Sequence, residues 1–212
     1  MKDLTDITFL LDRTGSMDSI RNDVVGGFNS FLKSQKEATG ETVMTLIQFD
    51  SQDPHEVKYE CIRIQDVDEM KPRHFVPRAA TPLLDAMGQA IMTVGLRLSK
   101  MPDEERPDKV VFVVFTDGYE NASRNYSSEW IKEMVEEYRD SYKWQFVFLG
   151  AEIDAFEQGD AIGISKAHTL SSSREGTSRA LNMVGEKVAK FSVSGAAQDL
   201  AWTDEERKEV EK

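Results

Sequence analysis

Short apolar segments alternate along the chain with longer segments in which apolar residues recur every three or four positions. Residues 4–11 and 109–116 are almost continuously apolar, and the second contains Val-Val-Phe-Val-Val-Phe. Such runs are typical of strands that are buried on both faces of a parallel sheet. Residues 18–39 and 83–98 instead carry their apolar residues at helical spacing, and both predict amphipathic helices.

The remaining segments continue this alternation. Residues 43–49 and 56–64 are extended segments joined by a short polar loop with a proline, which predicts a hairpin and one antiparallel edge strand. Repeated strand and helix units predict an α/β fold with a doubly wound, mostly parallel sheet and helices on both faces, as in Rossmann-like proteins. The other predicted elements are helices at 127–142, 153–161 and 173–192 and strands at 144–149 and 167–170.

Length and composition favour one folded domain. The chain has 212 residues, of which 40% are hydrophobic and 30% are charged, an ordinary balance for a globular protein. We assign residues 1–195 to a single domain. The charged segment 196–212 is interpreted as a tail or a helix end.

Net charge and the absence of sorting signals limit the classes of binding partner and the cellular compartment that we expect. With 38 acidic and 26 basic residues the formal net charge is -12, which disfavours nucleic acid and favours cations or basic partners, although solubility alone also explains it. The apolar run near the N-terminus is too short for a secretory signal, and no stretch is long enough to span a membrane. The single cysteine, Cys61, cannot form an internal disulfide, which fits a reducing compartment. Together these features lead us to expect a cytoplasmic protein without membrane contact.

Hydroxyl and carboxylate side chains follow the predicted strands. Asp12, Thr14 and Ser16 alternate along the loop after the first strand, Asp117 follows the most apolar strand, and Thr81 precedes a helix. Ligand sites in such folds lie beyond the carboxyl ends of the strands, so we expect these side chains to converge there. An alternative role for Ser16 is to cap the helix that follows it.

The types of these side chains indicate the ligand. Oxygen donors without sulfur or imidazole suit a hard cation, so the sequence predicts Mg²⁺, with Mn²⁺ or Ca²⁺ as alternatives. Two carboxylates only neutralise a dication and leave its shell incomplete. A Glu or Asp from a protein partner would then complete the coordination.

At these residues the chain resembles the von Willebrand factor type A family. Its metal-ion-dependent adhesion site is written Asp-x-Ser-x-Ser with a separate Thr and a separate Asp; here it reads Asp12-x-Thr14-x-Ser16, Thr81 and Asp117. The resemblance spans residues 3–188. It is especially close to prokaryotic or phage members in the words Leu-Leu-Asp-Arg-Thr-Gly-Ser-Met, Ala-Thr-Pro-Leu-Leu-Asp-Ala and Phe-Thr-Asp-Gly-Tyr-Glu-Asn-Ala-Ser.

The resemblance implies roles for these residues. In the family the two loop hydroxyls and the distant threonine are inner ligands, and the aspartates bind directly or through water. These roles fall on Thr14, Ser16 and Thr81, and then on Asp12 and Asp117. Threonine in place of the usual serine at residue 14 keeps the hydroxyl but adds a methyl group that crowds the site.

Several neighbours of these motifs have open roles. Asp85 and Glu120 either orient ligands of the metal or lie on a solvated helix surface, and Arg13 is expected to face outward. The three histidines are scattered without the spacing of metal ligands or catalytic groups.

Three functions compete. The first is a non-enzymatic module that binds a partner through the metal, since we find no pair of nucleophile and base and no phosphate-binding or hydrolase motif. The second is a Mg²⁺-dependent phosphoryl-transfer enzyme of the haloacid-dehalogenase type, which would need an aspartate where Thr14 stands. The third is a scaffold subunit of an intracellular complex with an empty metal site.

Overall fold

In the computed structural model, which describes residues 3–211, six strands form one sheet in the order β3–β2–β1–β4–β5–β6. Neighbouring strands run parallel, except that β3 is antiparallel to β2. This confirms the predicted α/β sheet with one antiparallel edge strand. The strands are β1 (Leu4–Asp12), β2 (Glu41–Asp50), β3 (Asp53–Arg63), β4 (Lys109–Thr116), β5 (Gln145–Ala151) and β6 (Thr169–Ser172).

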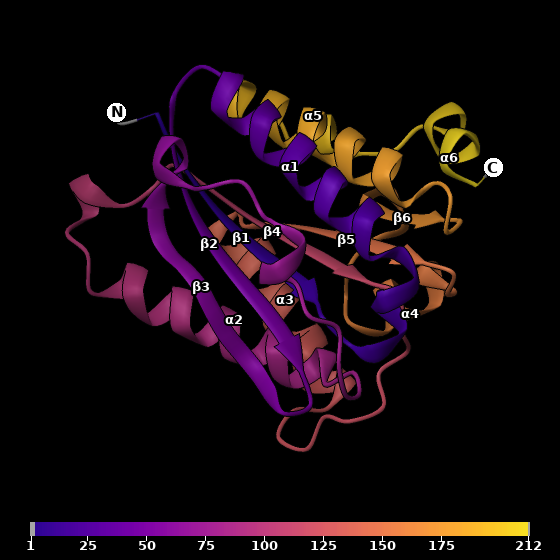
Figure 1. Cartoon of the computed structure of the whole chain (residues 1–212). Helices are drawn as coiled ribbons and strands as arrows, with labels where there is room; N and C mark the ends of the chain where they lie inside the picture. The colour runs from indigo at the N-terminus through magenta and orange to yellow at the C-terminus, as the bar shows by residue number, and fades with distance from the viewer. Residues whose placement is uncertain (1–2, 212) are drawn as a thin grey trace.

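Helices cover both faces of this sheet (Figure 1). One layer contains α1 and α5 and the other contains α2 and α3, so the doubly wound arrangement is also confirmed. Within residues 3–211, no helix combines the length and the apolar character needed to cross a membrane. The helices are α1 (Arg21–Glu37), α2 (Leu83–Ser99), α3 (Ser128–Tyr142), α4 (Ala155–Ala161), α5 (Thr177–Ser194) and α6 (Asp204–Val210).

The sheet divides the hydrophobic core into two parts. Successive side chains of the central strand β4 point to opposite faces, so its continuous apolar run serves both cores at once. Trp202 belongs to the core under α1 and α5, and Trp144 belongs to the core under α2 and α3. The β4 side chains in the first core are Val111, Val113 and Phe115, and those in the second are Val110, Phe112 and Val114.

Several predicted elements begin later than expected. The helix predicted from residue 18 starts with a 3-10 turn, η1 (Gly15–Ile20), and becomes an α-helix only at Arg21. The helices predicted from residues 153 and 173 begin at Ala155 and Thr177. The last strand is β6 (Thr169–Ser172), displaced from the predicted 167–170, because a 3-10 turn over Lys166–His168 precedes it. All of these differences concern element ends, which local turns decide.

The segment after residue 195 packs onto the domain. Thr203 and Glu206 form a capping box that starts α6. Leu200, Trp202 and Val210 are all buried, and Ser173 N donates to the Val210 carbonyl at 2.8 Å, which ties the segment to the chain just before α5. Residues 196–211 therefore contain a short helix of their own, α6, and its Val210 lies in the core. Residues 1–2 and 212 of the predicted ranges lie outside the described residues.

Candidate metal centre

Two aspartates stand at the carboxyl edge of neighbouring central strands. Asp12 is the last residue of β1, and Asp117 directly follows β4. The pairing of Leu11 with Phe115 brings the two strand ends level, so both carboxylates leave the sheet at the same edge. This is the edge where open α/β sheets bind ligands.

The carboxylate of Asp12 is fully buried and receives only uncharged donors. Thr14 N donates to Oδ1 at 2.7 Å, and Thr116 Oγ1 donates to Oδ2 at 2.5 Å. Burial raises the pKa of Asp12 to about 7, because these hydrogen bonds offset only part of the lost hydration and the negative charge of Asp117 adds to it. Asp12 is thus a buried acid without a compensating positive charge.

The loop hydroxyls connect Asp12 to Asp117. Thr14 Oγ1 lies 3.3 Å from Ser16 Oγ, and Ser16 Oγ donates to Asp117 Oδ1 at 2.6 Å. The Ser16 hydroxyl is therefore directed at the carboxylate. Its alternative role as a helix cap is wrong, because Ser16 lies inside η1 and the residue that precedes α1 is Ile20. Burial also raises the pKa of Asp117, in spite of the hydrogen bond from Ser16.

The hydroxyl of Thr81 lies against the turn that carries Asp117. A β-carbon added to Gly118 would stand 2.9 Å from Thr81 Oγ1, so the absence of a side chain there lets the two segments meet. Asn121 holds the backbone of Thr81 from both sides: its Oδ1 accepts from Thr81 N at 2.9 Å and its N donates to Thr81 O at 3.1 Å. The structure thus brings Asp12, Thr14, Ser16 and Asp117 into one hydrogen-bonded chain, with Thr81 beside it.

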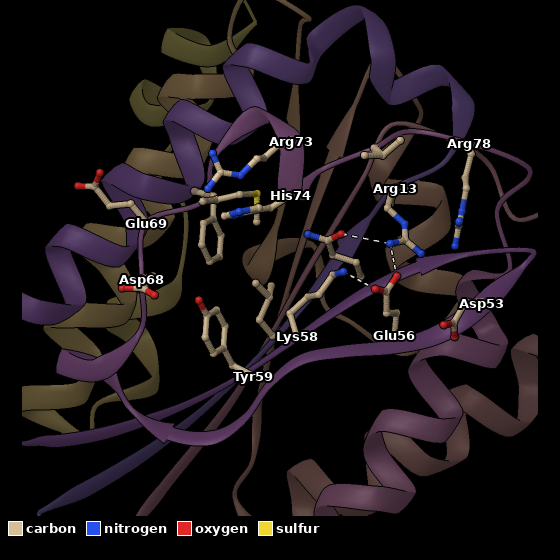
Figure 2. Close-up of a pocket in the computed structure, with 15 residues that line it drawn as sticks. Arg13, Asp53, Glu56, Lys58, Tyr59, Asp68, Glu69, Arg73, His74 and Arg78 are labelled. Carbon is tan, nitrogen blue, oxygen red and sulfur yellow. Dashed lines mark hydrogen bonds and ion pairs between the residues drawn. The ribbon is translucent and has the colours of Figure 1, made fainter.

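Arg13 does not face outward, and that expectation is wrong. Its side chain is 5% exposed, and its Nε and Nη2 donate to Asp50 Oδ2 at 2.9 and 2.6 Å. It also pairs with Glu56, as Figure 2 shows. The reason is Asp50, a fully buried carboxylate at the end of β2 that requires a cation. Arg78 Nε donates to the same oxygen at 2.9 Å.

Asp50 consequently titrates differently from Asp12. Burial acts to raise the pKa of Asp50, but hydrogen bonds from Arg78, the Gln52 backbone and Arg13 outweigh it and lower the pKa below its ordinary value. The sequence analysis missed Asp50 and Arg78. The one available signal was that Asp50 ends the strand next to the first, and a pairing partner could not be read from spacing.

Asp85 and Glu120 hold a loop beside the candidate centre. Asp85 is buried and accepts from the backbone N–H groups of residues 124, 125 and 126 at 3.0, 2.9 and 3.1 Å. Glu120 accepts from the N–H groups of residues 122 and 123 at 2.8 and 2.7 Å and from Leu84 N at 3.0 Å. Neither lies on a solvated helix surface. Both fix the segment 120–126 onto the start of α2.

The donor set fits a hard cation. In the described chain, no group of three or more His, Cys, Asp or Glu side chains gathers as a metal site. The candidate centre instead offers two carboxylates and three hydroxyls, all of them oxygen donors of the kind that Mg²⁺, Mn²⁺ and Ca²⁺ prefer. None of these five residues offers a thiolate or an imidazole as a ligand.

Comparison with solved structures identifies the fold. A scan against models of protein families and a search of curated proteins give no match. Proximal thread matrix protein 1 from the mussel byssus matches with a TM-score of 0.61 and 16% identity, over 88% of this chain and 46% of that one. The von Willebrand factor type A protein from Catenulispora acidiphila matches with a TM-score of 0.58 and 11% identity, over 87% of this chain and 42% of that one.

A third solved structure is matched over a larger share of its own length. The manganese-loaded TRAP protein of Plasmodium vivax has a TM-score of 0.56 and 14% identity, over 87% of this chain and 74% of that one. The chain therefore has a von Willebrand factor type A fold. It spans less than half the length of the mussel and Catenulispora chains.

Proposed function

We propose that this protein is a non-enzymatic, metal-ion-dependent protein-binding module. In this proposal a Mg²⁺-type cation, held by Asp12, Thr14, Ser16, Thr81 and Asp117, bridges to a Glu or Asp carboxylate of a partner. The observation that carries the proposal is the environment of Asp12. Its carboxylate is fully buried, and among residues 3–211 it has no ion-pair partner. A buried charge without a counter-charge is costly, and a bound cation would remove that cost.

The arrangement divides the work among the five residues. The hydroxyls of Thr14, Ser16 and Thr81 would supply neutral oxygen ligands, and the two carboxylates would supply the negative charge, directly or through water. When bound, the cation acts as an electrophile for one further oxygen ligand. Because the two carboxylates only neutralise a dication, that ligand can carry its own negative charge, which favours a carboxylate of a partner.

The compared proteins support a metal at this edge of the fold. One structure of the mussel protein has a zinc-occupied MIDAS motif, and the Plasmodium protein is manganese-loaded. Their sequences are less than a fifth identical to this chain, so they support the proposal through the shared fold alone.

The phosphoryl-transfer alternative is less compatible with the sequence of the metal loop. A nucleophilic aspartate of this type needs a second aspartate two residues later, and Thr14 stands there. A phosphatase screen with Mg²⁺ tests this alternative, which would be revived by turnover that Asp12→Asn abolishes.

Calorimetric titration of Mg²⁺ and Mn²⁺ into chelator-treated protein tests the proposal. We expect one saturable site in the wild type and none in Asp12→Ala or Asp117→Ala. Asp23→Ala, which removes an exposed carboxylate in the first turn of α1, should bind as the wild type does. Equal binding by wild type and Asp12→Ala, or no binding to folded wild type, would overturn it.

A further inference from the structure

A cavity of about 670 Å³ is lined in part by Arg13, the residue between Asp12 and Thr14 of the candidate metal loop. It lies between the β2–β3 hairpin and the segment that connects β3 to α2 (Figure 2). Its volume falls in the range of sites that bind small ligands. The hairpin cavity, as we call it, is lined by Phe28, Leu46, Gln48, Tyr59, Met70 and Val76, with charged residues around them.

One lining residue presents an unused hydrogen-bond donor. Gln48 is fully buried, and its Oε1 accepts from Arg13 Nη1 at 3.4 Å. Its Nε2 has no hydrogen-bond partner within the described residues. Buried amide groups are nearly always paired, because leaving them unpaired costs free energy. A ligand with a carbonyl oxygen would satisfy this group.

The charges around the cavity exclude most ionic ligands. Arg13 and Lys58 both pair with Glu56, and Figure 2 shows the two cations turned toward that carboxylate. The outer rim carries both signs, with Arg73 on one side and Asp68 on the other. Without a surplus of either sign, the cavity does not favour a phosphate or a metal. The lining mixes polar groups, whose charges are balanced, with the apolar side chains named above. Together with the single free amide, this mixture fits an uncharged side chain with an adjoining backbone carbonyl.

The position of Arg13 links this cavity to the metal loop. Its backbone lies between Asp12 and Thr14, while its guanidinium lines the cavity. None of the five proposed metal ligands lines the cavity, so a chain segment bound at the metal would have to extend past Arg13 to reach it. We propose that the hairpin cavity receives an aromatic or large aliphatic side chain of the same partner segment whose carboxylate completes the metal shell. In this inference, which rests on the proposed function, the carbonyl of the inserted residue accepts from Gln48 Nε2.

Short peptides test the inference, with NMR spectra of the ¹⁵N-labelled full chain as the readout. N-acetyl-phenylalaninamide probes the cavity alone, and N-acetyl-aspartamide probes the metal alone. Peptides of the form acetyl-Asp-(Gly)n-Phe-amide, with glycine spacers of increasing length, probe both sites together. We expect the first probe to shift the Gln48 side-chain amide signals with or without Mg²⁺. The second should shift signals of the metal loop only with Mg²⁺.

The linked peptides carry the decisive result. At one spacer length we expect binding at least about tenfold tighter than either single probe, because the second contact becomes intramolecular. Chelation should reduce this affinity to that of the phenylalanine probe. Val76→Trp, which fills the cavity from an exposed position, should abolish the gain. Val193→Trp is the matched control, since Val193 on α5 is equally exposed at 52% and does not line the cavity.

The outcomes separate the two proposals. If the phenylalanine probe leaves the Gln48 signals unchanged, or Val76→Trp binds the linked peptides as the wild type does, the cavity inference is overturned. If no linked peptide exceeds the single probes, the shared partner segment is overturned as well. If the phenylalanine probe binds but the aspartate probe has no Mg²⁺-dependent effect, the failure belongs to the proposed metal function.

Discussion

Asp12 and Asp50 end two neighbouring strands and are equally buried, yet their surroundings differ. Asp50 has Arg13 and Arg78 beside it, and its pKa is lowered. Asp12 has only neutral donors, and burial raises its pKa to about 7. Burial therefore does not decide what a carboxylate does. The charge of Asp50 is compensated by arginines of the same chain, and the ion pairs stabilise the fold. The charge of Asp12 has no such partner and would be compensated by a bound cation.

The direction of one side chain produces this difference. Arg13 immediately follows Asp12, and successive residues of an extended chain point to opposite sides. Its guanidinium thus reaches Asp50 and Glu56 and stays away from the oxygens of the metal loop. An arginine turned to the other side would occupy the place of the cation. The four predictions below test this contrast between a buried carboxylate with an ion-pair partner and one without.

The largest effect on stability is expected at Asp50. Asp50→Asn leaves Arg13 buried without its main counter-charge and should lower the free energy of unfolding by about 3–5 kcal/mol. Urea denaturation measures this. Asp140→Asn, which removes an Arg–Asp pair from the surface, is the control and should change the free energy of unfolding far less, because water screens exposed ion pairs. Because the pKa of Asp50 is lowered, its contribution is present above its unfolded pKa and is lost as the pH falls below about 4.

Asp12→Asn should have the opposite profile. At pH 8 the metal-free variant should be at least as stable as the metal-free wild type, because a buried uncompensated charge has been removed. It should also lose the stabilisation by Mg²⁺, which for the wild type amounts to about 2.7 kcal/mol at a hundred times the dissociation constant. Thermal unfolding with and without Mg²⁺ checks both. A metal-free variant far less stable than the wild type would show that Asp12 is structural, like Asp50.

Gly118→Ala should weaken metal binding while leaving the fold intact. Its β-carbon would displace the Thr81 hydroxyl, from which it would stand 2.9 Å, and we expect an affinity loss of about 10–100-fold. Gly26→Ala is the matched control, since a β-carbon there meets nothing within 4 Å. Calorimetry compares the two variants. Unchanged affinity in Gly118→Ala would remove Thr81 from the ligand set.

Over one pH unit, the smallest effect is a dependence of metal binding on pH. Asp12 and Asp117 both have raised pKa values and must lose their protons to bind a cation. Affinity should thus fall by about tenfold for each pH unit below 7 and level off above it. In metal-free protein the sign is reversed: the raised pKa of Asp12 means that its contribution to stability is lost as the pH rises from about 4 through 7. A flat affinity between pH 5 and 8 would contradict this assignment.

Much of the fold could be predicted from periodicity. The residues of β4 were predicted without error, because a short apolar run rich in valine is typical of a strand covered on both faces. The convergence of Asp12 and Asp117 at one edge follows from the parallel direction of β1 and β4. The metal itself stays a prediction, since its evidence is the chemistry of the side chains.

The errors concern side chains whose direction depends on distant neighbours. Arg13 was expected in solvent because nothing in its own loop attracts it, and its partner Asp50 lies 37 residues away in the sequence. Asp85 and Glu120 bind backbone groups of a loop whose path only the folded chain defines. A hydrophobic pattern specifies which face of an element is covered, but it does not specify pairs of polar groups.

The sheet divides the core into two parts, and each part contains one buried tryptophan whose fluorescence can report on it. Trp144 is 4% exposed in the core under α2 and α3, Trp202 is 7% exposed in the core under α1 and α5, and Trp130 is 51% exposed. With Trp130 and one buried tryptophan replaced by phenylalanine, the emission of the remaining indole follows one side of the sheet alone. Coincident melting of the two emissions would show that both layers unfold in one cooperative step, and separate melting would show which layer loosens first.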